Sequence, residues 1–495
     1  MGRKTVYAMI LRRFASSAIE RKRISIIGSG PSGFYTAYHL LSKCQVPLDV
    51  WLWEALPTPF GLSRYGVAPD HPEVKNCEDT FTAIANRYAG DTQPGEHQFR
   101  FIGNVTVGRD LPLKSIIDNF DATILSYGCS GDNRLGIPGE ETSSGVFTSR
   151  EFVNWYNSHP HYAKESRLND FDWTKVRRVG IIGNGNVSLD ITRLLLTSNI
   201  DEIWGNTDIN QNAIRLLQQA PIEEVRLIAR RDFLHSKFTN KELRELWELE
   251  KYGIRGYIDP QFFTPSEWDL SGMERSIKRR IEMCEQYLKP FHERKGKSFT
   301  KYAPPSEGYS KRWVLDYLKT PLAINTGSNG LITSLSFCEN TITKENRVIS
   351  NNSKELSYEI DLLITSLGYR GQPLPDYSDL GIDFSRNRVA CNAGGQVLNK
   401  SGNVIPGLFT SGWIRKGGNG VIMTTMMDSF NVGDAVMKYI SQLPLKPRTA
   451  TEVNLTGLNY TTWATWLKID AIEKDNASNG QPRQKLQTVE EMLKV

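Results

Sequence analysis

The chain has 495 residues, more than one hydrophobic core usually supports, so we expect at least two domains. Hydrophobic residues make up 39% of the chain and charged residues 23%. No run approaches the roughly 18 apolar residues that a membrane-spanning helix requires. The composition therefore predicts a soluble, globular protein and excludes the integral membrane class.

Basic residues dominate the first twenty-three positions, which hold seven Lys or Arg and the single acid Glu20. An Arg-rich, acid-poor, amphipathic start is typical of a mitochondrial presequence, whereas a secretory signal needs a longer apolar centre. A disordered basic arm is the alternative. We predict a presequence over residues 1–22 and a matrix location, with peripheral attachment to the inner membrane left open. Without residues 1–23 the formal net charge changes from +5 to −1, so any basic binding face must be local.

The cysteines are scattered and include no C-x-x-C pair, which argues against a metal knuckle and against a redox-active dithiol. We expect inert thiols at all six positions, Cys44, Cys77, Cys129, Cys284, Cys338 and Cys391.

Residues 24–54 predict a βαβ unit in which an apolar strand runs into the turn GSGPSG, a helix follows, and a second strand ends in Glu54. Gly28 permits the tight turn, Gly30 lets a pyrophosphate reach the backbone, and Gly33 lets the helix lie close to the strand. The start of the helix offers N–H groups and a positive dipole end to phosphates. Because Glu54 would accept both hydroxyls of an unmodified ribose, this site fits FAD or NAD.

A second apolar strand, residues 179–182, runs into the turn GNGNVS, whose third glycine position is taken by the small residue Ser188. The strand predicted at 225–229 ends in Arg230 and Arg231 instead of an acid. Two guanidinium groups bind a 2′-phosphate that a carboxylate would repel. The second site is therefore predicted to prefer NADPH to NADH.

Glu242 lies in a predicted helix at 240–250 and could hold a ribose hydroxyl or a group on the nicotinamide side. A solvated helix surface is the alternative for such a residue.

Residues 121–128 and 361–368 are both apolar strands that end in a glycine, and such strands fit two crossings between nucleotide-binding domains. We therefore expect an α/β protein with two Rossmann-like dinucleotide-binding domains. The NADP domain, residues 143–361, is inserted into a FAD domain formed by residues 23–142 and 362–495.

Glycines precede a helix predicted at 424–443, in the stretch KGGNGVI. A reduced flavin carries negative charge near N1 and O2, which the N–H groups at such a helix start would stabilise. A turn before a packed helix is the alternative.

Together these motifs resemble the mitochondrial adrenodoxin reductase type of ferredoxin–NADP reductase, also called NADPH:adrenodoxin oxidoreductase, and above all its fungal members. The resemblance covers nearly everything from Arg23 onward. Its densest stretches are GSGPSGFYTAYHLL, PFGLSRYGVAPDHPEVKN, FIGNVTVGRD, ILSYG, IPGE, GNGNVSLDI, TNKELREL, SGWIRKGGNGVI and QPRQKLQTVEEML.

The glycine motifs and the resemblance together imply which positions hold each cofactor. For FAD these are Gly28, Gly30, Ser32, Gly33, Glu54, Leu62, Val107, Trp413, Gly420, Val421 and Ile422. For NADP they are Asn184, Gly185, Asn186, Val187, Arg230, Arg231, Glu242 and Gly420. The departures are modest, since Asn184 stands where glutamine is common and Ser32 replaces an alanine.

His71 and Asp190 match family positions near the reaction centre and are the two candidate catalytic residues. A satisfied structural pair is the alternative to proton handling. No nucleophile or metal is required, because hydride transfer from NADPH to FAD and one-electron release are chemistry of the cofactors.

The family's partner is an acidic mitochondrial [2Fe-2S] ferredoxin, which would need a basic docking face. Residues 271–320 contain twelve Lys or Arg against six acids. The resemblance places the ferredoxin contacts at Arg275, Lys278, Arg279 and Arg280. A solvated basic helix is the alternative, and no nucleic-acid recognition motif accompanies the charge.

The sequence favours an NADPH:ferredoxin oxidoreductase, with iron–sulfur cluster or haem A synthesis downstream as the family implies. Two alternatives stay open: a flavoprotein that reduces quinone or oxygen directly, and a non-catalytic NADPH-binding flavoprotein. Disulfide reduction is disfavoured by the missing cysteine pair.

Overall fold

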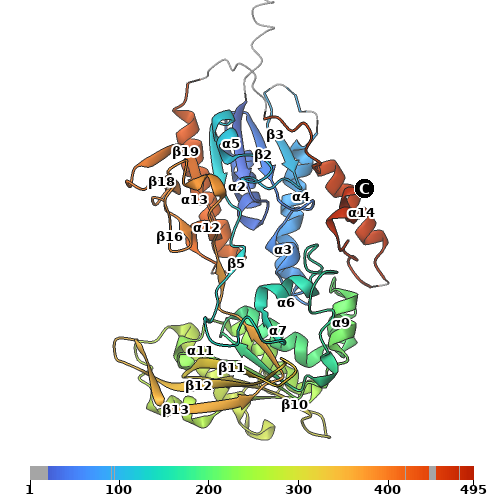
Figure 1. Ribbon diagram of the computed structural model, residues 1–495, viewed down its shortest axis with the longest axis vertical. Coiled ribbons are helices and arrows are strands. Elements are labelled where there is room, and N and C mark those ends of the chain that lie inside the picture. Colours follow the sequence, from blue (N-terminus) through green and yellow to red (C-terminus); the bar gives the residue numbers. More distant parts are fainter. Residues whose placement is uncertain (1–20, 91, 94, 419, 445–452, 479) are drawn as a thin grey trace, which may run out of the picture.

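The computed structural model describes residues 21–495 except 91, 94, 419, 445–452 and 479. The described chain forms two units, one above the other in Figure 1, each built on its own six-stranded sheet. The predicted presequence lies outside the described residues except for Arg21 and Lys22. Lys22 is buried and begins the first strand, opposite Leu48.

The first unit contains a sheet in the order β18-β19-β4-β1-β2-β3, in which only the β18–β19 pair is antiparallel. Both faces of β1 are covered, since every residue from Ile24 to Ile27 is buried, as is typical of a parallel strand inside a sheet. The strand order reverses at β1, between β2 and β4, which is where open α/β sheets bind their ligands. The strands are β1 (Lys22–Ile27), β2 (Leu48–Trp53), β3 (Gln98–Ile102), β4 (Ala122–Leu125), β18 (Gln396–Leu398) and β19 (Val404–Thr410).

The second unit contains an all-parallel sheet in the order β6-β14-β7-β8-β10-β9. Here the order reverses at β7, between β8 and β14, so β7 corresponds to β1 of the first unit. The strands are β6 (Val146–Thr148), β7 (Arg178–Ile182), β8 (Glu224–Ile228), β9 (Ile254–Ile258), β10 (Lys311–Asp316) and β14 (Leu362–Thr365).

The chain crosses between the units twice, and the crossings are joined by an antiparallel pair of β5 (Gly131–Asp132) and β15 (Tyr369–Arg370). The predicted insertion of one nucleotide-binding unit into the other is therefore confirmed. The boundary predicted between residues 361 and 362 is wrong, because β14 pairs with β6 and β7 of the second unit. An apolar strand ending in glycine fits either sheet, and only its hydrogen-bonded neighbours distinguish the two.

A separate antiparallel sheet follows β10 in the second unit and consists of β11 (Lys319–Thr326), β12 (Ile332–Ile342) and β13 (Val348–Glu359). The longer helices are α2 (Pro31–Lys43), α4 (Cys77–Tyr88), α6 (Ser149–Tyr156), α7 (Asn186–Thr197), α10 (Asn240–Trp247), α11 (Arg275–Leu288), α13 (Ile422–Ser441) and α14 (Trp463–Asp475). None of the described helices is long and apolar enough to cross a membrane.

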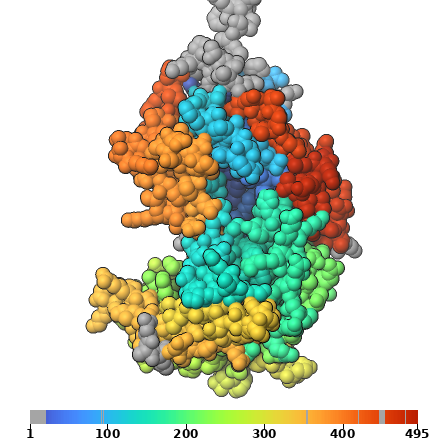
Figure 2. Space-filling view, in the orientation of Figure 1, coloured from blue at the N-terminus to red at the C-terminus, as the bar shows by residue number. Residues whose placement is uncertain are grey.

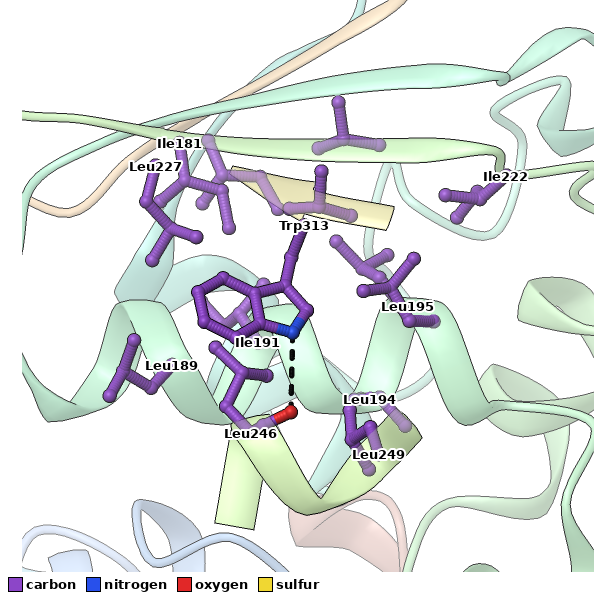
Figure 3. Close-up of a cluster of buried hydrophobic side chains, with 14 of the residues drawn as sticks. Ile181, Leu189, Ile191, Leu194, Leu195, Ile222, Leu227, Leu246, Leu249 and Trp313 are labelled. Atoms are coloured by element: carbon purple, nitrogen blue, oxygen red, sulfur yellow. Dashed lines mark hydrogen bonds between the residues drawn. The ribbon is translucent and has the colours of Figure 1, made fainter. Parts of the chain in front are cut away.

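The largest hydrophobic core belongs to the second unit and lies between its parallel sheet and the helices α7 and α10 (Figure 3). Trp313 on β10 is completely buried in it, and its indole N–H donates to the Leu246 carbonyl over 3.2 Å. The indole thus fills the space between sheet and helices and also satisfies a backbone acceptor near the end of α10.

Replacing Trp313 by Ala should lower the free energy of unfolding by about 3–5 kcal/mol, because it leaves a cavity and an unpaired carbonyl. Tyr257 on β9 is 41% exposed and provides the control, for which Tyr257→Ala should cost less than about 0.5 kcal/mol. Urea unfolding of both variants measures the difference. Equal losses would show that Trp313 does not anchor this core.

Candidate functional site

The first glycine turn has no space for side chains at two of its glycines. A Cβ on Gly33 would lie 1.9 Å from the Gly28 carbonyl oxygen, and a Cβ on Gly28 would lie 2.5 Å from Tyr127 Cα. Gly28 also has a φ of +102°, which disfavours other residues. Gly30 has open space beside it and precedes α2, whose first turn has no side-chain cap. The uncapped N–H groups at this helix start can therefore receive a pyrophosphate.

Glu54 lies directly after β2 with both carboxylate oxygens engaged near this turn. One oxygen accepts from the Ser29 backbone N–H (3.1 Å) and hydroxyl (2.6 Å), and the other accepts from the Leu56 N–H (3.1 Å). Burial raises the pKa of Glu54, although these hydrogen bonds oppose the shift. The oxygen that accepts only from Leu56 has a lone pair left, so the carboxylate remains able to hold a ribose hydroxyl while Ser29 fixes its position.

The C-terminal part of the first unit reaches the same helix start. Gly412, which has a φ of +73°, lies so close to α2 that a Cβ there would be 2.5 Å from Ser32 Cβ. The Ser32 hydroxyl bonds to Ser411 (2.9 Å) and Ser429 (3.2 Å) in a buried group of three serines. The Ser32 hydroxyl thus links α2 to α13 and to the residue after β19, which leaves the backbone of Ser32 as its main group for contacting a cofactor.

The other predicted flavin positions surround this junction from different elements. Leu62 begins the short helix α3 (Leu62–Tyr65), and Val107 is buried in the core on the other face of the sheet. Trp413 follows Gly412 and stacks obliquely on Tyr369 of the crossing, at 5.6 Å between ring centres. Gly420, Val421 and Ile422 precede or begin α13, whose start is uncapped by any side chain.

The second glycine turn repeats this geometry at β7. A Cβ on Gly183 would lie 2.1 Å from the Ser366 carbonyl oxygen, whereas Gly185 has nothing within 4 Å and precedes the uncapped start of α7. The side-chain oxygen of Asn184 is buried and has no hydrogen-bond partner, while its amide nitrogen donates to Ser236 over 2.9 Å. An open helix start beside an unpaired polar atom fits a bound nucleotide.

Two further turn residues have structural partners. Asn186 accepts from the Thr239 backbone N–H over 2.8 Å, which ties the turn to the cap of α10. Val187 is partly buried against the second unit's core. Their backbone N–H groups lie in the first turn of α7, where a phosphate would bind.

Arg230 and Arg231 follow β8, next to the turn after β7, and both are exposed. Neither guanidinium makes an ion pair or a hydrogen bond with any described residue. The backbone carries the contacts instead, since the Arg230 carbonyl accepts from Asn340 (2.9 Å) and the Arg231 carbonyl accepts from Leu318 N (3.3 Å). Two free guanidinium groups on a fixed turn suit a dianionic ligand.

Glu242 is buried and is not part of a solvated helix surface. Its carboxylate lies 3.5 Å from the Arg193 guanidinium and 3.8 Å from the His71 imidazole. Burial, and after it the charge of Asp190, raises the pKa of Glu242 to about 7. Near neutral pH this carboxyl group can therefore donate as well as accept a hydrogen bond.

Arg193 is the centre of a buried charge cluster at the boundary between the units. Its guanidinium donates to Asp70 (2.5 and 3.1 Å) and to Asp190 (3.0 Å), and it lies 3.1 Å from His71 Nε2. His71 in turn lies 2.7 Å from a Glu245 oxygen. Asp70 and His71 belong to the first unit and the other three residues to the second, so the cluster bridges the boundary.

The pKa shifts within the cluster are caused by burial, by the positive charge of Arg193 and by the neighbouring carboxylates. Burial raises the pKa of Asp190 despite the opposing charge of Arg193. Burial alone would raise the pKa of Asp70 as well, but Arg193 holds it below its usual value. Burial alone would lower the pKa of His71, but Glu245 and the other carboxylates raise it.

The candidate residues His71 and Asp190 thus meet through Arg193 and not directly, which favours a structural role for both. Sequence analysis missed Arg193, Asp70 and Glu245. Arg193 carried one usable signal, since it follows Asp190 by three positions on a helix, a spacing at which opposite charges meet. The pairing with Asp70 lies 123 residues away and had no local signal.

The predicted basic docking residues separate into two groups on α11. Arg275, Lys278 and Arg279 are exposed. Arg280 is buried and donates to the Ser236 carbonyl (3.0 Å) and the Phe238 carbonyl (2.9 Å). Its prediction as a docking residue is therefore wrong, because its guanidinium holds the segment before α10.

Fewer of the basic side chains in residues 271–320 are available for docking than their number in the sequence indicates, because several are buried or paired. Arg294 is buried against Glu250, and Lys319 is buried against Asp316 at 2.6 Å. Arg312 pairs with Glu224, and Lys311 donates to the Leu196 carbonyl at the end of α7. The exposed remainder is Arg275, Lys278, Arg279, Lys289, Lys295, Lys297 and Lys301.

Replacing Arg193 by Met should lower the free energy of unfolding by about 3–5 kcal/mol at pH 7, because it leaves buried carboxylates without their cation. A carboxylate with a depressed pKa stabilises the fold above its unfolded pKa of about 3.9, and this contribution is lost as pH falls through the folded value. The deficit of the variant should therefore shrink below about pH 4. Urea unfolding across pH measures it.

The control for this experiment is Arg244→Met on α10, since Arg244 is exposed and pairs with no described acid. It should cost less than about 0.5 kcal/mol. A deficit of Arg193→Met that does not change with pH would contradict the electrostatic account.

No model of a known protein family matches the sequence. The Saccharomyces cerevisiae protein named "Probable NADPH:adrenodoxin oxidoreductase, mitochondrial" is 57% identical over 465 residues, which cover 93% of either chain. The human protein named "NADPH:adrenodoxin oxidoreductase, mitochondrial" is 35% identical over 490 residues, covering 96% of this chain and 91% of the human one.

Among solved structures, Mycobacterium tuberculosis FprA in complex with NADPH has a TM-score of 0.79 and 30% identity to this chain. The match covers 96% of this chain and 99% of FprA. Similarity in sequence and in fold therefore extends along nearly the whole molecule, across both glycine turns and the crossings between them. The chain belongs to the family of the NADPH:adrenodoxin oxidoreductases and is an oxidoreductase of the ferredoxin–NADP reductase class.

Proposed function

We propose that this chain oxidises NADPH bound to its second unit, reduces FAD bound to its first unit, and delivers the electrons singly to an acidic mitochondrial [2Fe-2S] ferredoxin. The observation that carries the proposal is the charge difference between two equivalent sites. An acid, Glu54, follows the strand beside the first turn, whereas Arg230 and Arg231 follow the strand beside the second. The human relative is named for NADPH and adrenodoxin, and FprA is solved with NADPH.

When bound, FAD accepts a hydride as two electrons and releases them one at a time. The chain's own contribution is to place and enclose the cofactors. The N–H groups at the start of α2 would hold the FAD pyrophosphate, and Glu54 its ribose. The uncapped start of α13, at Val421 and Ile422, would stabilise negative charge on the flavin.

In the second unit the start of α7, from Gly185 to Val187, would hold the NADPH pyrophosphate, and the two arginines its 2′-phosphate. Glu242 would contact the nicotinamide side, where its raised pKa lets it act as donor or acceptor. Gly420 would lie where the nicotinamide meets the flavin. The space-filling view is hollowed between the two units, with atoms of the N-terminal part of the chain at its floor (Figure 2).

Replacing Arg230 and Arg231 together by Ala should raise the Kd for NADPH on the order of 100-fold, since charge-assisted hydrogen bonds contribute about 1.5–3 kcal/mol each. The Kd for NADH should change by less than about 3-fold, because NADH lacks the phosphate that these groups would contact. Titration calorimetry of both nucleotides measures the ratio.

Arg177 and Arg255 provide a matched control, since they lie at the opposite edge of the sheet, before or within β7 and β9. Their double Ala variant should leave both affinities unchanged. Equal losses for NADPH and NADH in the Arg230 and Arg231 variant would show that the 2′-phosphate binds elsewhere.

For the electron acceptor, we propose docking on the exposed part of α11. Arg275, Lys278 and Arg279 present three cations within one helix, which suits an acidic protein surface. The partner's identity rests on the family name, and the charge of this helix supports it. We further propose a mitochondrial location and a role in supplying electrons for iron–sulfur cluster or haem A synthesis.

Changing Arg275, Lys278 and Arg279 to Glu should raise the KM for a mitochondrial ferredoxin by at least about 10-fold at low ionic strength, because like charges then face each other. The effect should shrink in high salt, where charges are screened. Ferredoxin-dependent reduction of cytochrome c at varied ferredoxin concentration measures the KM.

The control is the triple Glu variant at Lys295, Lys297 and Lys301, which changes the net charge equally at exposed positions outside α11. A similar KM increase in the control would show that the overall charge of the protein determines the KM, and would contradict a docking site on α11. Cytochrome c reduction that is equally fast without ferredoxin would instead favour direct reduction of small acceptors.

A further inference from the structure

The two proposed cofactor sites lie on different units, so the relative orientation of the units controls the distance between the cofactors. Hydride transfer requires reacting atoms about 3–3.5 Å apart, and a misplacement of about 1 Å can slow a reaction 100-fold. Neither glycine turn fixes this orientation, because each lies within one unit. Contacts at the boundary must therefore do so.

The C-terminal segment consists of the described residues 453–478 and 480–495. It lies across this boundary on the side opposite the β5–β15 crossings (Figure 1). Its helix α14 packs on the first unit, where Trp463 and Trp466 join the hydrophobic core. Glu473 on α14 forms a buried ion pair with Arg64, whose guanidinium contacts both carboxylate oxygens at 2.5 and 2.7 Å. The segment is thus firmly attached to the first unit.

Beyond α14 the segment contacts the second unit. Gly480 lies so close to Asn206 that a Cβ there would be 2.3 Å from the amide oxygen. Lys164 forms an exposed ion pair with Glu491. The segment then returns to the first unit, where Met492 is buried in the core.

Lys485 occupies the middle of this path and is buried between the units. Its ammonium donates to the Arg64 carbonyl (3.0 Å) of the first unit and to the Asn157 carbonyl (3.2 Å) of the second. It also lies 2.8 Å from Asp208 of the second unit. All three N–H donors therefore have acceptors, and these come from both units.

Asp208 is shared with a second cation that crosses the same boundary, since Lys75 of the first unit lies 2.8 Å from it. Burial alone would raise the pKa of Asp208, but the two ammonium groups hold it far below its usual value. Burial lowers the pKa of Lys485 to about 7 against the attraction of Asp208. The three acceptors around Nζ indicate that Lys485 is protonated, so its ion pair with Asp208 is formed.

A buried ammonium is stable only when its hydrogen bonds are complete. If the units moved apart, Lys485 would lose either the Arg64 carbonyl or its two partners in the second unit. One orientation therefore satisfies the group, and the neighbouring orientations leave it unpaired.

We propose that Lys485 is a positioning residue that fixes the second unit against the first and thereby sets the distance for hydride transfer. The inference rests on the proposed placement of FAD and NADPH on separate units and goes beyond it. Lys485 touches neither glycine turn. Its effect should appear in the transfer step and in the order of the boundary, while each binding site keeps its own affinity.

The test compares the holoenzyme with Lys485→Met, Lys485→Gln and Lys164→Met. The Met variant at 485 keeps an unbranched side chain and removes every donor, whereas the Gln variant keeps an amide donor and should fold more readily. Lys164→Met removes the exposed ion pair of the same segment, and exposed pairs contribute little.

In stopped flow at saturating NADPH, we expect flavin reduction to slow at least 10-fold in Lys485→Met, by a smaller factor in Lys485→Gln, and by less than 2-fold in Lys164→Met. FAD content and the Kd for NADP⁺ should stay within about 2-fold of the parent in all three. Backbone hydrogen exchange at residues 156–160 and 64–66 should be at least 10-fold faster in Lys485→Met and unchanged in Lys164→Met.

Unchanged reduction and exchange in the Lys485 variants would overturn the proposal, as would equal effects of Lys164→Met. Loss of FAD or of NADP⁺ affinity matching the slower reduction would assign Lys485 to a binding site instead. A wrong placement of NADPH is recognised separately, because the Arg230 and Arg231 variant then fails its own test while the exchange result at the boundary still stands.

Discussion

Arg193 occupies the point on which the arrangement of this molecule depends, because its guanidinium is buried between carboxylates of two separate units. Asp70 comes from the segment after α3, and Asp190 comes from the helix that begins at the second glycine turn. A buried cation held by acids from both sides permits little relative movement without a large electrostatic cost. Together with the contacts of Lys485, this cluster restricts how the two proposed nucleotide sites can move relative to each other.

This constraint explains why titratable groups gather where no acid–base chemistry is needed. His71, Glu242 and Glu245 surround Arg193 within one buried cluster, and their pKa values are shifted by burial and by one another. Perturbed groups of this kind mark catalytic centres in many enzymes, but structural ion-pair networks shift pKa values as well. For His71 and Glu245, the contacts within this cluster and the position at the boundary favour the structural role.

The added antiparallel sheet of the second unit supports the proposed nucleotide site from outside. Asn340 on β12 is buried and donates to the Arg230 carbonyl, while its oxygen accepts from the Thr320 and Ser350 hydroxyls at 3.0 Å. The backbone of the arginine turn is therefore held while the guanidinium groups remain free. A rigid turn loses less conformational freedom when it binds a phosphate.

The sequence by itself determined both strand–turn–helix units, because a tight turn, a close helix and a polar residue at the next strand end are local requirements. Gly28, Gly33 and Gly183 lie where the backbone leaves no room for a side chain, and β7, β8 and α13 lie within one or two residues of their predicted positions. The opposite charges of Glu54 and Arg230 were also local signals. The insertion of one unit into the other followed from two similar strands.

Only the tertiary structure decided which residues meet across the units. Arg193 with Asp70 and Lys485 with Arg64 are separated by 123 and 421 residues, and no periodicity relates such distant positions. It also decided that β14 belongs to the second sheet and that Arg280 is buried, since strand neighbours and helix burial depend on packing. A charged residue in a sequence must be either hydrated or paired. Only the fold determines whether it contacts water or another residue, and which residue that is.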